Sequence, residues 1–308
     1  MNEPPVLHIE TPLVESRPLG IAAGRTVALK LEALQPCGSF KLRGIGAACA
    51  TYARRGARRF VSSSGGNAGL AVAYAGRVLS VPVTVVVPET TTARARRLIE
   101  QEGAELVVHG ASWMEANALA SSRLGPDDAF LHPFDDPLIW QGHATMIDEA
   151  VRQGPRPDAV VLSVGGGGLL CGVVEGLHRN GWGDVPVVAV ETVGAASLHA
   201  SLAAGHRVTL DAITSLATSL GAKQVCEAAW AWTRRHPIAS VVVSDAQAVD
   251  ACRRFVDDHR LVVEPACGAA LALAYEHHVA LEAYERVLVV VCGGATATVA
   301  QLDAWAAA

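Results

Sequence analysis

The sequence lacks the cysteine patterns and long apolar runs that mark disulfide-rich, zinc-binding or membrane-spanning proteins. Its seven cysteines are scattered, odd in number and never spaced as CxxC. This spacing argues against a disulfide framework or a zinc knuckle and favours a reducing compartment. No apolar run is long enough to cross a bilayer, and residues 1–10 lack the basic region and apolar stretch of a signal peptide. We therefore expect a cytoplasmic protein with no membrane partner.

Extended basic patches and the common hydrolytic motifs are also missing. The formal net charge is −5 over 308 residues, so the charge balance does not favour a nucleic acid as partner. Two short arginine-rich stretches, residues 54–59 and 94–97, are better explained as solvated helix faces. None of the eleven histidines follows HExxH or HxH spacing, and no GxSxG nucleophile elbow occurs. These absences argue against a zinc peptidase and a serine hydrolase.

Short apolar runs alternate with longer helical patterns from about residue 45 onward. Most runs are unbroken and rich in β-branched residues, as in parallel strands covered by helices on both faces. We predict strands at residues 59–62, 83–87, 105–108, 159–164, 187–190 and 287–291. We predict helices between them at residues 68–79, 92–101, 113–124, 169–180 and 247–257. The repetition of strand and helix indicates an α/β protein with open sheets.

Three predicted strands lead into glycine-rich turns, which we expect to be followed by helices. The turns lie at residues 62–69, 164–169 and 292–296. In α/β proteins ligands bind beyond the carboxyl ends of strands, where glycine lets the backbone approach and a helix start offers N–H groups to an anion. The four glycines Gly165–Gly168 make the strongest phosphate site, and tight helix packing is the alternative. Asn67 and the serines before it could bind a carboxylate or cap a helix, and Cys292 could be an ordinary core thiol.

A dinucleotide site is the main rival for these glycines. Its fingerprint needs glycines at positions i, i+2 and i+5. Counting from Gly165 or Gly166, the third position is Leu170 or Cys171. Glu191, directly after a predicted strand, does imitate the ribose-binding acid. With the third glycine missing, the match is weak and a nicotinamide enzyme is disfavoured.

Lys41 lies in the segment Gly38-Ser39-Phe40-Lys41-Leu42-Arg43-Gly44, where a turn of small residues precedes a helical stretch. Taken alone, such a lysine is most simply an exposed helix residue. A buried amine, by contrast, loses its proton and attacks carbonyl groups, so it can form a Schiff base. The glycine-rich turns favour this second interpretation, because they could hold an aldehyde cofactor against the amine.

Four motifs in this order resemble a known family. They are Gly38–Gly44, the Ser63–Gly69 loop, Gly165–Gly168 and Cys292-Gly293-Gly294. The chain resembles the fold type II pyridoxal-phosphate enzymes, the tryptophan synthase β-like group, from Thr11 to Gln301. It is most similar to the L-serine dehydratases, which is supported by residues 133–140 and 264–270.

The resemblance implies two open, twisted, mostly parallel sheets with helices on both faces and the cofactor in an interdomain cleft. The large domain would comprise residues 1–32 and 138–308. The small domain would comprise residues 33–137, with Lys41 and the loop that binds the substrate carboxylate.

The resemblance also implies the role of each site residue. Lys41 would form the Schiff base with pyridoxal phosphate and remove the α-proton of the substrate, with Phe40 packed on the cofactor ring. The phosphate would be held by Gly165, Gly166, Gly167, Gly168 and Leu169. Asn67 would bind the phenolic oxygen, and Cys292 would face the ring nitrogen. The substrate would bind to Ser64, Gly65, Asn67 and Ala68. A monovalent cation, K⁺, would be held by the Glu191 carboxylate and the carbonyl groups of Gly165, Ala195, Leu220 and Ala222.

The implied reaction is β-elimination of L-serine, and also of L-threonine, to pyruvate or 2-oxobutanoate and ammonia by a homodimer. A serine racemase and a β-replacement synthase are alternatives on the same scaffold, and a catalytically silent binding or regulatory protein is a more distant one. Cys292 favours elimination, because a thiol cannot hold the ring nitrogen protonated as a carboxylate would. Two residues depart from the liver-type pattern. Gly65 replaces a small side chain and would widen the substrate site, and Ser219 puts a hydroxyl where the ring expects a methyl group.

Overall fold

The computed structural model describes residues 5–307 and divides the chain into two units, each with its own sheet. Unit 1 contains the described residues up to Ile9 and Gln35–Gly142. Unit 2 contains Glu10–Leu34 and residues 143–307. Both units combine a mostly parallel sheet with helices, so the predicted α/β class is confirmed. Among the residues described, no helix is long and apolar enough to cross a membrane.

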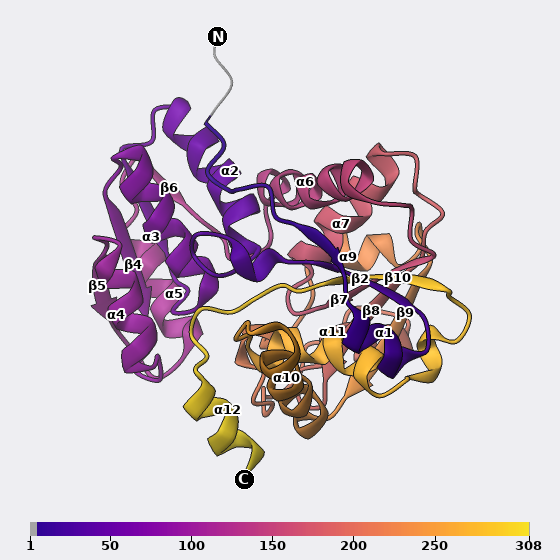
Figure 1. The fold of residues 1–308 in the computed structure, drawn as a ribbon. Coiled ribbons are helices and arrows are strands. Elements are labelled where there is room, and N and C mark those ends of the chain that lie inside the picture. The colour runs from indigo at the N-terminus through magenta and orange to yellow at the C-terminus, as the bar shows by residue number, and fades with distance from the viewer. Residues whose placement is uncertain (1–4, 308) are drawn as a thin grey trace. The chain divides into compact units, whose positions relative to one another are not determined.

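Unit 1 is built on a parallel sheet in the order β5-β4-β3-β6. Figure 1 labels β4, β5 and β6 of this sheet. Its strands are β3 (Arg59–Ser62), β4 (Val83–Val87), β5 (Glu105–Val108) and β6 (Asp128–Phe130). Its helices are α2 (Lys41–Arg54), α3 (Asn67–Leu79), α4 (Ala93–Gln101) and α5 (Trp113–Ser122). The inner strand β4 is buried at every position because α3 and α5 both pack against it, which suits its valine-rich sequence.

Unit 2 is built on a sheet in the order β1-β2-β10-β7-β8-β9 (Figure 1). Its strands are β1 (Leu13–Glu15), β2 (Thr26–Lys30), β7 (Ala159–Ser163), β8 (Val187–Thr192), β9 (Ile238–Val243) and β10 (Arg286–Val290). All of its described pairings are parallel except that of β1 with β2. The strands from β7 onward are linked through helices, as parallel neighbours require.

A wholly buried helix forms the centre of the unit 2 core. The helices that lie in this unit or run into it are α1 (Arg17–Ala23), α6 (Pro137–Gln153), α7 (Gly168–Arg179), α8 (Ser197–Ala204), α9 (Glu227–Trp232), α10 (Asp245–His259), α11 (Pro265–Tyr275) and α12 (Val299–Ala306). Every residue of α11 is buried, and the helix packs on β7, β8 and β10. Its small, apolar sequence allows this close packing against the sheet.

The predicted strands are confirmed, with small shifts at some ends. β3, β4 and β5 match the prediction to the residue, whereas β7, β8 and β10 begin or end one or two residues away. β1, β2, β6 and β9 were not predicted. The helix expected directly after the third glycine turn was wrong. Gly293 and Gly294 have φ +94° and +134°, and α12 begins only at Val299, where Thr298 caps it.

Candidate active site

Three neighbouring strands of unit 2 carry residues predicted to bind the cofactor and the cation. β10, β7 and β8 are parallel and adjacent, so their carboxyl ends lie at the same edge of the sheet. Gly165–Gly168 follows β7, Glu191 lies near the end of β8, and Cys292 follows β10. The structure therefore brings these features to one edge, where open α/β sheets bind ligands.

The Gly165–Gly168 turn is tightly packed at two of its positions. Gly167 has φ +96°, and a Cβ there would lie 2.4 Å from the Cβ of Ala229. A Cβ at Gly165 would lie 3.0 Å from the Cα of Leu220. α7 begins at Gly168, and its N-cap residue, Gly167, has no side chain that could cap the helix. The first N–H groups of a helix have no carbonyl partner within it, and together with the positive end of the helix dipole they fit a phosphate group at this turn.

Glu191 caps a helix in this structure. Its two carboxylate oxygens accept the backbone N–H groups of Leu198 at 2.8 Å and His199 at 2.7 Å, at the start of α8. Burial raises the pKa of Glu191 to about 7, although these two hydrogen bonds favour the ionised form. A bound cation would also favour the ionised form, so the carboxylate suits the ion proposed from the sequence.

The carbonyl groups predicted to share this cation lie in three loops of unit 2. Gly165 is packed against Leu220, which ends the short helix η2 (Thr218–Leu220). The Leu220 carbonyl accepts the N–H of Ala222 at 2.8 Å. Ala195 lies in the turn after β8, where its N–H donates to the Thr192 carbonyl at 2.9 Å. These contacts place Gly165 beside Leu220 and Ser219.

Cys292 lies at a turn that is packed against Glu264. A Cβ on Gly294 would lie 2.3 Å from the Cγ of Glu264, so glycine is needed for this buried carboxyl to fit beside the turn. A hydrogen bond with the Cys267 thiol, burial and the negative charge of Glu264 raise the pKa of Cys292 well above its usual range. Cys292 therefore carries a neutral thiol instead of a thiolate.

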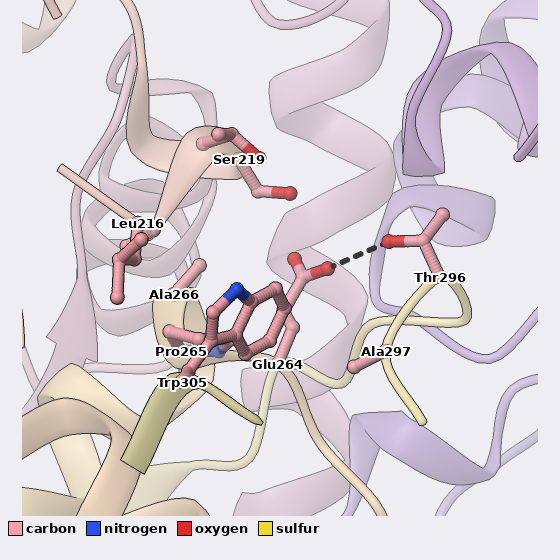
Figure 2. Close-up of a pocket in the computed structure, with 10 residues that line it drawn as sticks. Leu216, Ser219, Glu264, Pro265, Ala266, Thr296, Ala297 and Trp305 are labelled. Carbon is pink, nitrogen blue, oxygen red and sulfur yellow. Dashed lines mark hydrogen bonds between the residues drawn. The ribbon is translucent and has the colours of Figure 1, made fainter. Parts of the chain in front are cut away.

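A small pocket of unit 2 contains the same carboxyl group (Figure 2). Its lining residues are Leu216, Ala217, Thr218, Ser219, Glu264, Pro265, Ala266, Thr296, Ala297 and Trp305. Figure 2 shows the Glu264 carboxylate pointing toward Ser219 and Thr296, and the Thr296 hydroxyl donates to Glu264 Oε2 at 3.4 Å. Sequence reasoning gave no role to Glu264 or Thr296. The available signal was an acid directly before the proline that opens an apolar helix.

The three lysines of the sequence differ in their surroundings. Lys30 is fully buried in an ion pair with Glu149, with 2.6 Å between Nζ and Oε2. Lys223 is exposed and donates to the Asp211 carbonyl at 2.7 Å. The first is held as a charged partner and the second is solvated, so neither is suited to react with an aldehyde.

Lys41 begins α2 and is half-buried. Its Nζ donates to the Pro133 carbonyl at 2.7 Å and lies 5.1 Å from the centroid of the Phe40 ring. The start of a helix is an unfavourable place for a positive charge. Of the three lysines, Lys41 is therefore the one best suited to act as a nucleophilic amine.

The loop predicted to bind the substrate carboxylate connects β3 to α3 in unit 1. Asn67 is the first residue of α3 and is buried, and the residue before it, Gly66, has no side chain that could cap the helix. A Cβ at Gly69 would lie 1.8 Å from the carbonyl oxygen of Ser64, so α3 packs directly on the loop. At Gly65 the side chain of Thr91 occupies the place where a Cβ would lie, and the widening of the substrate site expected there stays a prediction.

Comparison with known proteins agrees with the resemblance seen in the motifs. The family model described as "Pyridoxal-phosphate dependent enzyme" matches residues 6–293. The chain belongs to this family. Its fold, with two mostly parallel sheets, is therefore that of the fold type II pyridoxal-phosphate enzymes.

Three similar proteins are informative. A human protein named L-serine dehydratase/L-threonine deaminase is 49% identical, over 97% of this chain and 94% of its own length. A mouse protein named serine dehydratase-like is also 49% identical, over 96% of this chain and 93% of its own length. The crystal structure of a fungal L-serine ammonia-lyase from Rhizomucor miehei is 38% identical with a TM-score of 0.92, covering 97% of this chain and 98% of that chain.

Proposed function

We propose that this enzyme catalyses the pyridoxal-phosphate-dependent β-elimination of L-serine, and also of L-threonine. The products are pyruvate or 2-oxobutanoate, with ammonia. The observation that carries the proposal is the near full-length similarity to L-serine dehydratases, together with Lys41 at the start of α2. When bound, the cofactor supplies an aldehyde for an amine and a ring that stabilises a carbanion at the substrate α-carbon.

Unit 2 supplies the residues that would hold the cofactor. The backbone N–H groups of Gly165–Gly168 and Leu169 bind the phosphate at the start of α7, where the helix dipole favours negative charge. Cys292 faces the ring nitrogen as a neutral thiol, which is consistent with the pKa raised by Cys267 and burial. A neutral thiol leaves the ring nitrogen unprotonated, and this favours elimination over racemisation.

Unit 1 supplies the base and the substrate-binding loop. Lys41 would bind the cofactor and then, as a neutral amine, would take the α-proton of the substrate. Phe40 would pack on the cofactor ring and Asn67 would hydrogen-bond its phenolic oxygen. Ser64, Gly65, Asn67 and Ala68 bind the substrate carboxylate at the start of α3. Residues 33–137 would form the small domain, and residues 1–32 and 138–308 the large one.

A potassium ion would bind at Glu191 and the carbonyl groups of Gly165, Ala195, Leu220 and Ala222. The buried Glu191 carboxyl and the packing of Gly165 against Leu220 support this site. We also propose a cytoplasmic homodimer. The seven free thiols support a reducing compartment, and the dimer rests on the resemblance to the family.

The test is to incubate the purified protein, loaded with pyridoxal phosphate, with L-serine alone. Pyruvate formed without an added nucleophile would support elimination. D-serine as the main product would make the protein a racemase, and a requirement for an added thiol would make it a synthase. A cofactor bound to the lysine should give a visible absorption band that borohydride abolishes. A protein that lacks this band would be a silent binding protein.

A further inference from the structure

The loop predicted to bind the substrate carboxylate is crowded at one position by a residue from another turn. An ideal Cβ on Gly65 would lie 2.5 Å from Thr91 Oγ1, 2.7 Å from Thr91 Cγ2 and 3.2 Å from Thr91 Cβ. No Cβ atom tolerates neighbours this close. At the adjacent Gly66, by contrast, no described atom lies within 4 Å of a Cβ. The crowding is therefore specific to position 65.

The position of Thr91 follows from the sheet of unit 1. β3 and β4 are parallel neighbours, with Ser62 opposite Val85, so the turns after both strands leave the same edge. The Thr91 N–H donates to the Pro88 carbonyl at 3.0 Å, and the next residue, Thr92, caps α4. The Thr91 backbone is thus held between the end of β4 and the start of α4.

The shape of threonine makes this contact hard to relieve. Two heavy atoms on its Cβ restrict rotation about χ1, and both of them contact the place of the missing Gly65 Cβ. Rotation about χ1 relieves both contacts only when it turns the β-hydrogen toward Gly65, and Thr91 Cβ then still lies 3.2 Å from the place of a Gly65 Cβ. A β-carbon at position 65 therefore requires Thr91 to leave the position that it has in this structure.

We propose that Thr91 is a positioning residue for the substrate-carboxylate loop, where its side chain replaces the β-carbon that Gly65 lacks. This inference rests on the proposed binding of substrate by Ser64, Gly65, Asn67 and Ala68. Thr91 sets how far the loop can move toward the turn before α4. Gly65 and Thr91 together, and not Gly65 alone, set the discrimination between L-serine and L-threonine.

A double-mutant cycle on the cofactor-loaded enzyme tests the inference. Gly65→Ala should raise the KM for L-serine about tenfold or more, because overpacking displaces the loop. Thr91→Ala should lower the preference for L-serine over L-threonine by about threefold or more, because the loop gains room for a larger side chain. In the double variant the methyl group introduced at position 65 takes the vacated space, and the KM for L-serine should return to within about threefold of the wild-type value.

Conservative substitutions of Thr91 distinguish an effect of its side-chain shape from an effect of hydrogen bonding by its hydroxyl group. Thr91→Val keeps both branches at Cβ and should behave as wild type, whereas Thr91→Ser should lie between wild type and Thr91→Ala. Thr90→Ala removes an exposed side chain from the same turn and should change neither KM nor substrate preference. A Thr91→Val variant as impaired as Thr91→Ala would overturn the shape argument.

The melting temperatures of the wild type, the two single variants and the double variant are also measured, by thermal unfolding of the cofactor-free protein. Additive effects of the two substitutions on both KM and melting temperature would overturn the inference. Coupling in melting temperature with an unchanged KM would reduce Thr91 to a packing residue and also overturn it. A wild-type protein that forms no pyruvate would instead refute the proposed function, so the two failures are distinguishable.

Discussion

Glu191 makes the stability of this protein depend on pH in a way that can be calculated. Its carboxyl group is fully buried, and burial raises its pKa from 4.5 to about 7. Between these two values the unfolded chain releases the proton while the folded protein retains it. The free energy of unfolding then falls by about 1.4 kcal/mol per pH unit, which amounts to about 3 kcal/mol over the window. The contribution of protonated Glu191 to the free energy of unfolding is fully present below pH 4.5 and is lost above about pH 7.

Glu191→Gln removes the titration but keeps most of the shape. Like the protonated acid of the wild type, the amide offers one carbonyl oxygen to the N–H groups of Leu198 and His199, so the variant should match wild type to within about 1 kcal/mol at low pH. Its stability should not fall across the window, so above about pH 7 the variant should be more stable than wild type by about 2–3 kcal/mol. The assay is urea unfolding of the cofactor-free protein from pH 4.5 to 8.5, in a buffer whose cation is tetramethylammonium. Glu89→Gln removes the same charge from an exposed site and serves as the control.

The proposed cation would bind to the same Glu191 carboxylate, so its effect on stability should depend on pH. Potassium should bind the ionised form and so raise the melting temperature of wild type more at pH 8 than at pH 5, with no such effect in Glu191→Gln. Parallel pH profiles for wild type and Glu191→Gln would show that burial does not perturb this group. An equal potassium effect in both proteins would place the ion elsewhere.

Three further substitutions test the active site and the core. Lys41→Ala should abolish turnover and the visible band of the lysine-bound cofactor, whereas Lys223→Arg should keep both; a Lys41→Ala enzyme that still turned over L-serine would refute the mechanism. Gly167→Ala forces a side chain into a left-handed backbone beside Ala229, and should cost about 1–3 kcal/mol in urea unfolding and weaken cofactor binding in a fluorescence titration. Lys30→Met leaves the Glu149 carboxylate buried without its ammonium partner, and should cost about 3–5 kcal/mol in urea unfolding, most of it recovered when Glu149 is also replaced by Leu.

The predicted strands show which elements local sequence can reveal. β4 and β7 are nearly continuous runs of apolar residues, because parallel strands covered on both faces need no polar alternation. β9 (Ile238–Val243) was missed although it ends in three valines, and it lies partly buried at the edge of its sheet. β1 and β6 have only three residues each, which is too short for any periodic pattern.

Motifs formed by consecutive residues could be recognised in the sequence, because their chemistry depends on residues that are neighbours in the chain. The position of Lys41 at a helix start and the glycine-rich turn Gly165–Gly168 at the start of α7 both depend on neighbours in sequence. The family, the α/β class and the proposed lysine base all follow from such motifs. The helix expected directly after the third glycine turn was wrong, because two glycines with positive φ continue a loop as readily as they begin a helix.

Contacts between distant segments were decided only by the folded chain. The order of β10, β7 and β8 brings the phosphate turn, Glu191 and Cys292 to one sheet edge, although more than 100 residues separate Gly165 from Cys292. The packing of Thr91 against Gly65 depends on two adjacent strands ending together. No local pattern encodes either arrangement, because strand order is set by how helices and strands share one core and not by the residues of any single turn.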